Sequence, residues 1–374
     1  MRNTVDFRLI FILALAIACR ISIAFFSGLP WYSTDSADYL RMADAILSGH
    51  PVPYFPNGYP LIIVLVKLCS FGVDLGKCLL SLNCLLSMLS VWLVYQIGKK
   101  LNSEGVGLLA ALALAVWPNH LNYVRFVLSE VSCTFFILLG VYLFLVKRLF
   151  LSAFAFYLAA MVRSTIFPVI PCVIILMLVF KTDKKLIYCF VFGALLAFSV
   201  DKGAQVEGYI RAPENLSMNL LVAIQSQSHG SINFNLEKYS NVQRDNALLT
   251  YVDFARDNFA DFLRQRVLSV YELWGPYPSG GDEKTPRGMF SRLLIGLHFP
   301  IFVVSLLAVR ARRQALEYWI VLAPILSITL VHMAFFSTPR FAVTVEPLAL
   351  ILSASYLFSF FATRRKPDSN VLRD

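Results

Sequence analysis

The sequence predicts an all-α polytopic membrane protein with about ten transmembrane helices, and three observations lead to that class. Apolar residues make up 58% of the 374 residues and charged residues only 15%, and a soluble protein of this length cannot hide so much apolar surface. The apolar residues gather in runs that approach the roughly twenty residues needed to cross the hydrocarbon of a bilayer. Short clusters of positive charge separate those runs.

The first run, Phe7–Ser27, predicts a retained span. It is too long for the apolar part of a cleaved signal peptide, and no small-residue cleavage site follows it. Nine further runs complete the predicted set: Lys77–Gly98, Gly105–Tyr123, Val131–Val146, Leu149–Val162, Ile166–Phe180, Leu186–Val200, Phe290–Val309, Leu316–Phe336 and Phe341–Phe361.

The positive charges predict that both termini lie in the cytoplasm, because cytoplasmic loops are enriched in Lys and Arg. With the N-terminus inside, every short inner loop is basic: Arg2 and Arg8; Lys99 and Lys100; Lys147 and Arg148; Lys181, Lys184 and Lys185; Arg310, Arg312 and Arg313; and the tail Arg364, Arg365 and Lys366. The short outer turns around Arg125, Arg163 and Arg340 hold one cation each.

An eleventh span at Tyr59–Phe71 would invert every later loop and break this pattern. We therefore predict that Tyr59–Phe71 is an interfacial helix at the outer face, with Lys67 extending to the membrane surface. The net charge of +10 follows from the topology and faces anionic membrane lipids. It does not indicate a nucleic-acid partner.

Four parts follow along the chain. Residues 1–200 form an N-terminal membrane module that contains the first outer loop, 28–76. Residues 201–288 form an outer-face (periplasmic) segment, in which apolar residues at helical spacing over Asn246–Leu268 predict a surface helix packed on the bundle. Residues 289–363 form a C-terminal membrane part of three helices, and 364–374 a cytoplasmic basic tail.

The cysteines and histidines predict no metal cofactor. All seven cysteines lie in or beside apolar runs, the five histidines are scattered, and no Cys/His spacing typical of a zinc site occurs.

Charged residues near the outer ends of the spans are the candidate functional groups, because a charge at mid-bilayer costs roughly 2.5–3.5 kcal/mol. They are Arg20, Asp35, Asp38, Glu130, Arg163, Arg340 and Glu346. Their convergence predicts an outer-face cleft that handles an anionic substrate. Structural alternatives stay open: Arg20 as partner of a buried carboxylate, Glu130 at a helix start capped by Ser129, Asp38 as a solvated residue, and Arg163 and Arg340 as interface anchors.

The order of residues after the first span carries a resemblance. Asp35 is followed by Tyr39, Ala43 and Gly49 and then by Asn57-Gly58-Tyr59-Pro60. This pattern resembles the GT-C superfamily of polyprenyl-phosphate-sugar-dependent glycosyltransferases, in particular the branch of the protein O-mannosyltransferases and the bacterial lipid A aminoarabinose transferase. Further matches in order are Arg20, Ser129-Glu130 after Pro118, Arg163-Ser164-Thr165, and Pro339-Arg340-Phe341 with Pro347.

The resemblance implies an inverting glycosyltransferase on the outer face of the bacterial cytoplasmic (inner) membrane. It would move one sugar from a polyprenyl-phosphate donor to a glycolipid, polysaccharide or protein. Asp35 would be the catalytic base. The remaining roles implied are donor-phosphate binding by Arg340 and Arg163, acceptor or ion binding by Glu130 and Asp38, and support by Tyr39, Tyr59 and Arg20.

The chain departs from some relatives at Tyr54-Phe55-Pro56-Asn57, where they carry a lysine for the lipid phosphate. No obligatory cofactor is expected, although some superfamily members use a divalent metal. Two other classes stay open. One is a multi-span transporter or lipid-linked-sugar flippase. The other is an O-antigen polymerase or ligase, which would use outer-loop arginines such as Arg211, Arg244, Arg256, Arg264 and Arg266.

Overall fold

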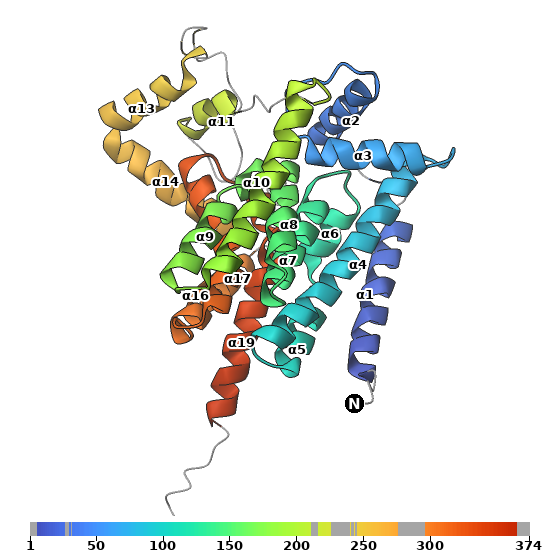
Figure 1. Cartoon of the computed structure of the whole chain (residues 1–374), viewed down its shortest axis with the longest axis vertical. Coiled ribbons are helices and arrows are strands. Elements are labelled where there is room, and N and C mark those ends of the chain that lie inside the picture. The colour runs from blue at the N-terminus through green and yellow to red at the C-terminus, as the bar shows by residue number, and fades with distance from the viewer. Residues whose placement is uncertain are drawn as a thin grey trace, which may run out of the picture.

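A computed structural model describes residues 6–26, 30, 32–210, 216–225, 240, 243, 245–275 and 296–364, and every regular element in these ranges is a helix (Figure 1). The elements are α1 Phe7–Phe26, α2 Thr34–Leu47, α3 Gly58–Cys69, α4 Leu75–Leu101, α5 Glu104–Ala115, α6 Pro118–Val124, α7 Glu130–Leu145, α8 Leu149–Val162, η1 Ser164–Ile166, α9 Val169–Val179, α10 Lys184–Val206, α11 Leu216–Ala223, α13 Ala247–Asp257, α14 Phe259–Trp274, α16 His298–Ala311, α17 Leu316–Ala334, α18 Pro339–Ala342 and α19 Glu346–Arg364.

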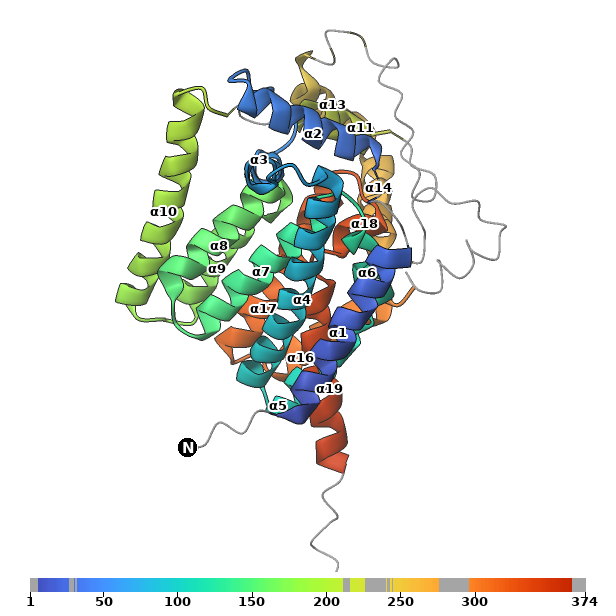
Figure 2. The ribbon, with the colours of Figure 1, turned by 90° about the vertical axis from the view of Figure 1, so that its right-hand side faces the viewer.

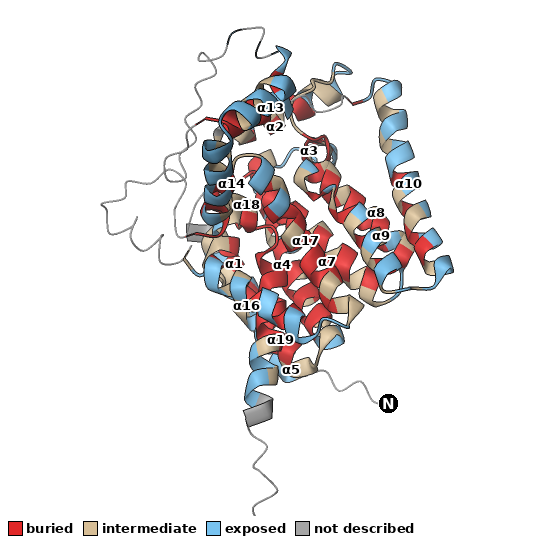
Figure 3. Cartoon of the chain, turned by 90° about the vertical axis from the view of Figure 1, so that its left-hand side faces the viewer, coloured by how far each residue is buried: buried red, intermediate tan, exposed pale blue. Residues whose placement is uncertain are grey.

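The apolar helices form a bundle whose buried residues concentrate in its centre, on α4, α7 and α17 (Figure 3). Four described helices, α1, α4, α10 and α17, are long and apolar enough to cross a membrane. The other predicted spans fall on shorter apolar helices. The all-helical membrane class is therefore confirmed, while the number of ten crossings stays a prediction. The predicted tail 364–374 lies outside the described residues from position 365 onward, as do residues 290–295 of one predicted span.

The span predicted over Gly105–Tyr123 is wrong as one continuous helix: α5 ends at Ala115 and α6 begins at Pro118. Proline lacks the N–H that would continue the helix and is favoured at the first position of a new one. The carbonyl of Ala115 accepts a hydrogen bond from Arg20 Nη1 at 3.0 Å. Arg20 thus satisfies the carboxyl-terminal end of α5 at the break.

The predicted alternative that Arg20 neutralises a buried carboxylate is also wrong. Its side chain is buried, and its described partners are the carbonyls of Ala16 and Ala115 and the hydroxyl of Ser87. Ser87 Oγ lies 2.7 Å from Arg20 Nε. Arg20 therefore joins α1, α4 and α5 by hydrogen bonds to uncharged groups.

Helices α2 and α3 lie across the end of the bundle opposite the start of α1 and the end of α19 (Figures 1 and 2). A reciprocal pair of hydrogen bonds between Ser33 and Ser36 caps the start of α2. The ion pair of Lys67 with Asp44 joins α3 to α2. The helix predicted over Tyr59–Phe71 is present as α3, Gly58–Cys69, and its place at a membrane interface stays a prediction.

The helix predicted over Asn246–Leu268 is two helices, because the chain leaves helical geometry at Asn258, with φ −128° and ψ 47°. The second of them, α14, packs on the bundle, as predicted for the surface helix. Its Trp274 is buried, stacks on Phe302 of α16 at 4.4 Å between ring centroids, and donates to Thr329 of α17.

Gly58 sets how closely α3 approaches α8. A Cβ atom there would lie 2.6 Å from the carbonyl carbon of Met161 and from the amide nitrogen of Val162. Backbone atoms cannot rotate away as a flexible side chain can, so α3 would have to shift. We expect Gly58→Ala to cost about 1–3 kcal/mol of stability, as overpacking of a close contact does, measured by thermal unfolding of the purified protein in detergent.

Gly203→Ala is the matched control, because a Cβ at this helical position in α10 meets nothing within 4 Å. Alanine is the better helix former there, so the unfolding temperature should be unchanged or slightly higher. Equal unfolding temperatures for the two variants would contradict the assigned role of Gly58.

Candidate functional site

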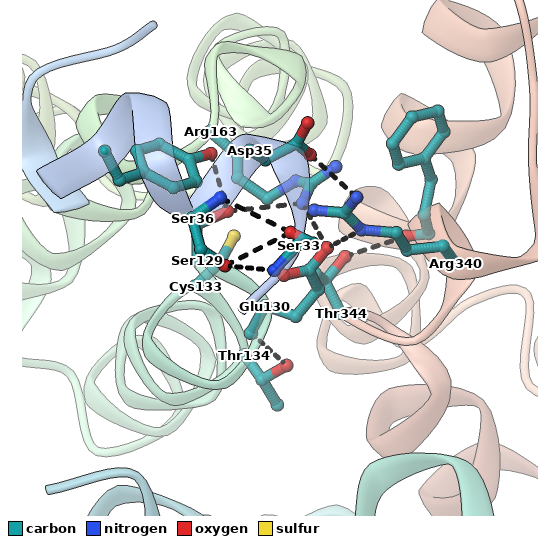
Figure 4. A network of polar contacts seen from close by, with 12 residues as sticks. Ser33, Asp35, Ser36, Ser129, Glu130, Cys133, Thr134, Arg163, Arg340 and Thr344 are labelled. Atoms are coloured by element: carbon teal, nitrogen blue, oxygen red, sulfur yellow. Dashed lines mark hydrogen bonds and ion pairs between the residues drawn. The ribbon is translucent and has the colours of Figure 1, made fainter. Parts of the chain in front are cut away.

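Arg340 connects three elements at the end of the bundle that α2 covers (Figure 4). It lies on the short helix α18, which begins at Pro339. Its Nη1 lies 2.7 Å from Asp35 Oδ2 in the first turn of α2, and its Nε pairs with Glu130 Oε1 at the start of α7. One guanidinium therefore neutralises two carboxylates that come from different helices.

Glu130 is the buried centre of this cluster, with only 1% of its side chain exposed. The same oxygen that pairs with Arg340 also lies 2.9 Å from Arg163 Nη1. Arg163 follows the last residue of α8 and stands over the ring of Phe341 at 5.0 Å. Two arginines thus offset the cost of burying one carboxylate, and they draw α7, α8 and α18 together.

Ser129 does not cap α7, contrary to the predicted alternative. Its side chain makes no cap hydrogen bond; its Oγ instead accepts hydrogen bonds from Tyr39 Oη at 3.2 Å and from Arg163 Nη1 at 3.3 Å. Through Ser129, Tyr39 of α2 is therefore linked to Arg163 of the charged cluster.

Tyr39 and Tyr59, the two tyrosines of the sequence pattern, lie buried next to the charged cluster. The ring of Tyr39 meets that of Tyr59 edge to face, with 5.0 Å between centroids, and both side chains are buried. Tyr39 belongs to α2, outside the predicted spans, and burial raises its pKa to about 12. The phenol therefore stays protonated near neutral pH and can keep donating to Ser129.

Exposure differs across the cluster in a way that bears on chemistry. The side chains of Asp35 and Arg340 are 33% and 21% exposed, so solutes can reach both. The cluster of Asp35, Glu130, Arg163 and Arg340 carries two formal charges of each sign. An accessible carboxylate beside an accessible guanidinium can accept a proton and bind an anion at neighbouring points.

The structure does not bring Asp38 into this cluster. Asp38 instead pairs with Arg41 at 3.0 Å on the exposed side of α2. Arg20, as described above, bonds to α4 and to the end of α5. Of the predicted site residues, Asp35, Glu130, Arg163, Arg340, Tyr39 and Tyr59 lie together.

Glu346 lies in a second buried polar group that the sequence did not predict as a unit. It accepts hydrogen bonds from Trp117 Nε1 at 3.0 Å and from Asn119 Nδ2 at 3.1 Å, and it pairs with His298. The group joins the starts of α16 and α19 to the region of the α5–α6 break. The sequence marked Glu346 as a charge near the outer ends of the spans and placed it in the same cleft as Asp35, whereas the structure puts it in this separate group. Pro118 is a further signal, since a break inside an apolar run exposes backbone that needs polar partners.

Within the described ranges, no group of three or more His, Cys, Asp or Glu residues could hold a metal ion. Both carboxylates of the charged cluster face a guanidinium instead.

No protein-family model matches the sequence, and no curated protein sequence is significantly similar to it. Solved structures do match the fold. The archaeal oligosaccharyltransferase AglB from Archaeoglobus fulgidus, in complex with an inhibitory peptide and a dolichol-phosphate, aligns with 97% of this chain at 12% identity and a TM-score of 0.55. The apo form of the Archaeoglobus fulgidus oligosaccharyltransferase aligns with 95% at 14% identity and a TM-score of 0.60.

A third structure, of the same enzyme tethered to an acceptor peptide containing the NVT sequon, aligns with 96% of this chain at 11% identity and a TM-score of 0.53. The chain spans about half the length of these structures, at 51%, 51% and 50%. These likenesses show that the chain shares the fold of the matched part of these oligosaccharyltransferases.

Removing the charge of Glu130 should destabilise the protein strongly, because Arg163 and Arg340 would lose the carboxylate they share. We expect Glu130→Gln to cost about 3–5 kcal/mol, the usual effect of breaking a buried ion pair, and to lower the unfolding temperature in detergent. Arg41→Gln is the control, since its pair with Asp38 is exposed and exposed pairs contribute little. Similar unfolding temperatures for both variants would contradict the shared ion pair.

Proposed function

We propose that this protein is an integral membrane glycosyltransferase that moves a single sugar from a polyprenyl-phosphate donor to an acceptor at the outer face of the membrane, with inversion. The observation that carries the proposal is the contact of 2.7 Å between Asp35 and Arg340, which sets an accessible base beside an accessible anion binder. The likeness to oligosaccharyltransferases that were solved with a dolichol-phosphate and with an acceptor peptide supports a lipid-phosphate donor and a separate acceptor.

In this mechanism Asp35 accepts the proton of the acceptor hydroxyl as that oxygen attacks the anomeric carbon of the sugar. The bond from the sugar to the phosphate oxygen breaks, and the lipid phosphate leaves with the electron pair. The phosphate leaves as a stable anion, so no general acid has to protonate it. Attack from the side opposite the leaving phosphate inverts the anomeric centre.

Arg340 stabilises the leaving phosphate in this proposal. Its guanidinium has a fixed fork of donors that matches phosphate oxygens and stays charged throughout. The Nη1 contact to Asp35 then has a second role, because it holds the Asp35 carboxylate within hydrogen-bond reach of the attacking hydroxyl. Arg163 is the second candidate for binding the donor phosphate, and Glu130 holds both arginines in place.

The outer-face location rests on the distribution of charge. The site lies at the end of the bundle opposite the start of α1, while the basic end of α4, with Lys99 and Lys100, lies on the side of that start (Figure 2). Because basic ends favour the cytoplasm, we place the site outside, in a bacterial inner membrane. The acceptor is a glycolipid, a glycan or a protein, and we expect no obligatory metal.

Two of the five outer-loop arginines named for the O-antigen polymerase or ligase class are engaged in contacts within the protein. Arg266 is buried against backbone carbonyls, Arg256 pairs with Asp257, and Arg264 is exposed. Arg211 and Arg244 lie outside the described residues. The complementation experiment with Asp35→Asn distinguishes a transporter or flippase from a glycosyltransferase.

Asp35→Asn should leave a folded protein with about a hundred- to ten-thousand-fold less activity, the usual loss when a general base is removed. The measurement is the mass of envelope glycolipids and glycans in cells that lack the protein and are complemented with equal amounts of each variant. A one-sugar increment restored by wild type and by Asp38→Asn, but not by Asp35→Asn, is the expected result. Restoration by Asp35→Asn as well would favour a transporter, and a changed polymer length would favour a polymerase.

Arg340→Lys should also fail to restore the increment, although it keeps the positive charge. A lysine ammonium is a point charge and cannot bind two phosphate oxygens in the plane of a fork. Arg41→Lys, on the exposed side of α2, serves as the matched control and should restore it fully. Normal restoration by Arg340→Lys would place the phosphate site elsewhere.

A further inference from the structure

Helix α14 carries an unbroken apolar stripe on its exposed side. Phe259, Leu263, Val267 and Tyr271 recur every four residues and are 66%, 52%, 62% and 45% exposed. Residues four apart share one face of a helix. On another face the helix is buried through Arg266, Ser269 and Leu273, so the stripe is separate from the face that packs on the bundle.

Hydrogen bonds fix the depth of α14 relative to α17, a helix long and apolar enough to cross a membrane. Arg266 Nη1 donates to the carbonyl of Ala334, the last residue of α17. Trp274 Nε1 donates to Thr329 Oγ1 at 3.1 Å. Thr329 lies five residues before Ala334, or about 7.5 Å along the helix axis. From Arg266 onward, α14 therefore runs from the end of α17 into the depth of that span.

The surface next to the stripe has the character of a lipid-facing span. Leu330 and Met333 on α17 are 58% and 38% exposed, and Phe299 on α16 is 50% exposed. Both helices pack against α14, with Trp274 stacked on Phe302 of α16. Figures 1 and 3 show α14 at the flank of the bundle with much of its outer surface exposed. The exposed charges Asp261 and Arg264 lie toward the start of α14, whereas Glu272 near its deep end is buried within the protein.

We propose that the second half of α14 is embedded in the outer leaflet, with Val267 and Tyr271 against lipid acyl chains. Phe259 and α13 then lie at the level of the headgroups. Membrane lipid is the occupant because the stripe continues the exposed apolar surface of a span and reaches below the end of that span. Part of the predicted aqueous segment 201–288 is thus a membrane-embedded flank. This inference does not depend on the proposed activity.

Photolabelling of the native chain in nanodiscs tests the proposal. Two phosphatidylcholine probes carry a diazirine near the acyl carbonyl or near the terminal methyl, and mass spectrometry locates the labelled residues. The shallow probe should label Val267 and Tyr271, with the label falling through Leu263 to Phe259. Phe192 and Leu195, exposed in the middle of α10, are the positive control for the deep probe, and Leu248 and Leu249 of α13 should stay nearly unlabelled.

Three results would overturn the proposal. If α10 is labelled and α14 is not, the stripe faces water. If Val267 or Tyr271 forms adducts between two chains, or loses lipid label as the number of chains per nanodisc rises, the occupant is a second copy. If Phe259, Val267 and Tyr271 carry equal label, α14 does not descend into the leaflet.

Discussion

The contact of Arg340 with two carboxylates is the interaction on which the site depends. Asp35 reaches the Arg340 guanidinium from α2, and Glu130 reaches it from α7. One guanidinium therefore fixes both α2, which lies across the end of the bundle, and the start of α7. Glu130 is almost fully buried, and a carboxylate in that setting is tolerated only with close partners. The Arg340 guanidinium thus joins the helices of the site and also lies beside the accessible carboxylate of Asp35.

Two buried polar groups of this protein serve the ends of helices, and this follows from the apolar surroundings. Backbone groups at a helix end need partners that lipid cannot give. Arg20 satisfies the end of α5, and Glu346 gathers Trp117, Asn119 and His298 beside the break between α5 and α6. Glu346 also starts α19, shortly after Arg340 in the chain, so this second polar group anchors the segment that carries the site.

The surface of the molecule combines two environments. The charged cluster lies under α2 and is reachable through Asp35, while α14 presents an apolar stripe on the flank of the bundle. A lipid-linked donor has the same two-part chemistry, with a charged phosphate and an apolar chain. The placement that we propose, at the boundary between water and lipid, would keep each part of the donor in its preferred solvent.

The sequence by itself determined the all-helical membrane class, since composition and run length depend only on the transfer of side chains between water and lipid. It also predicted that seven charged residues near the outer ends of the spans converge, and the structure brings four of them together: Asp35, Glu130, Arg163 and Arg340. Only the tertiary structure decided that Arg340 rather than Arg20 joins the carboxylates, that Asp38 points to Arg41, and that Glu346 lies in a separate polar group. Those outcomes depend on side-chain directions and contacts between distant helices, which no local pattern encodes.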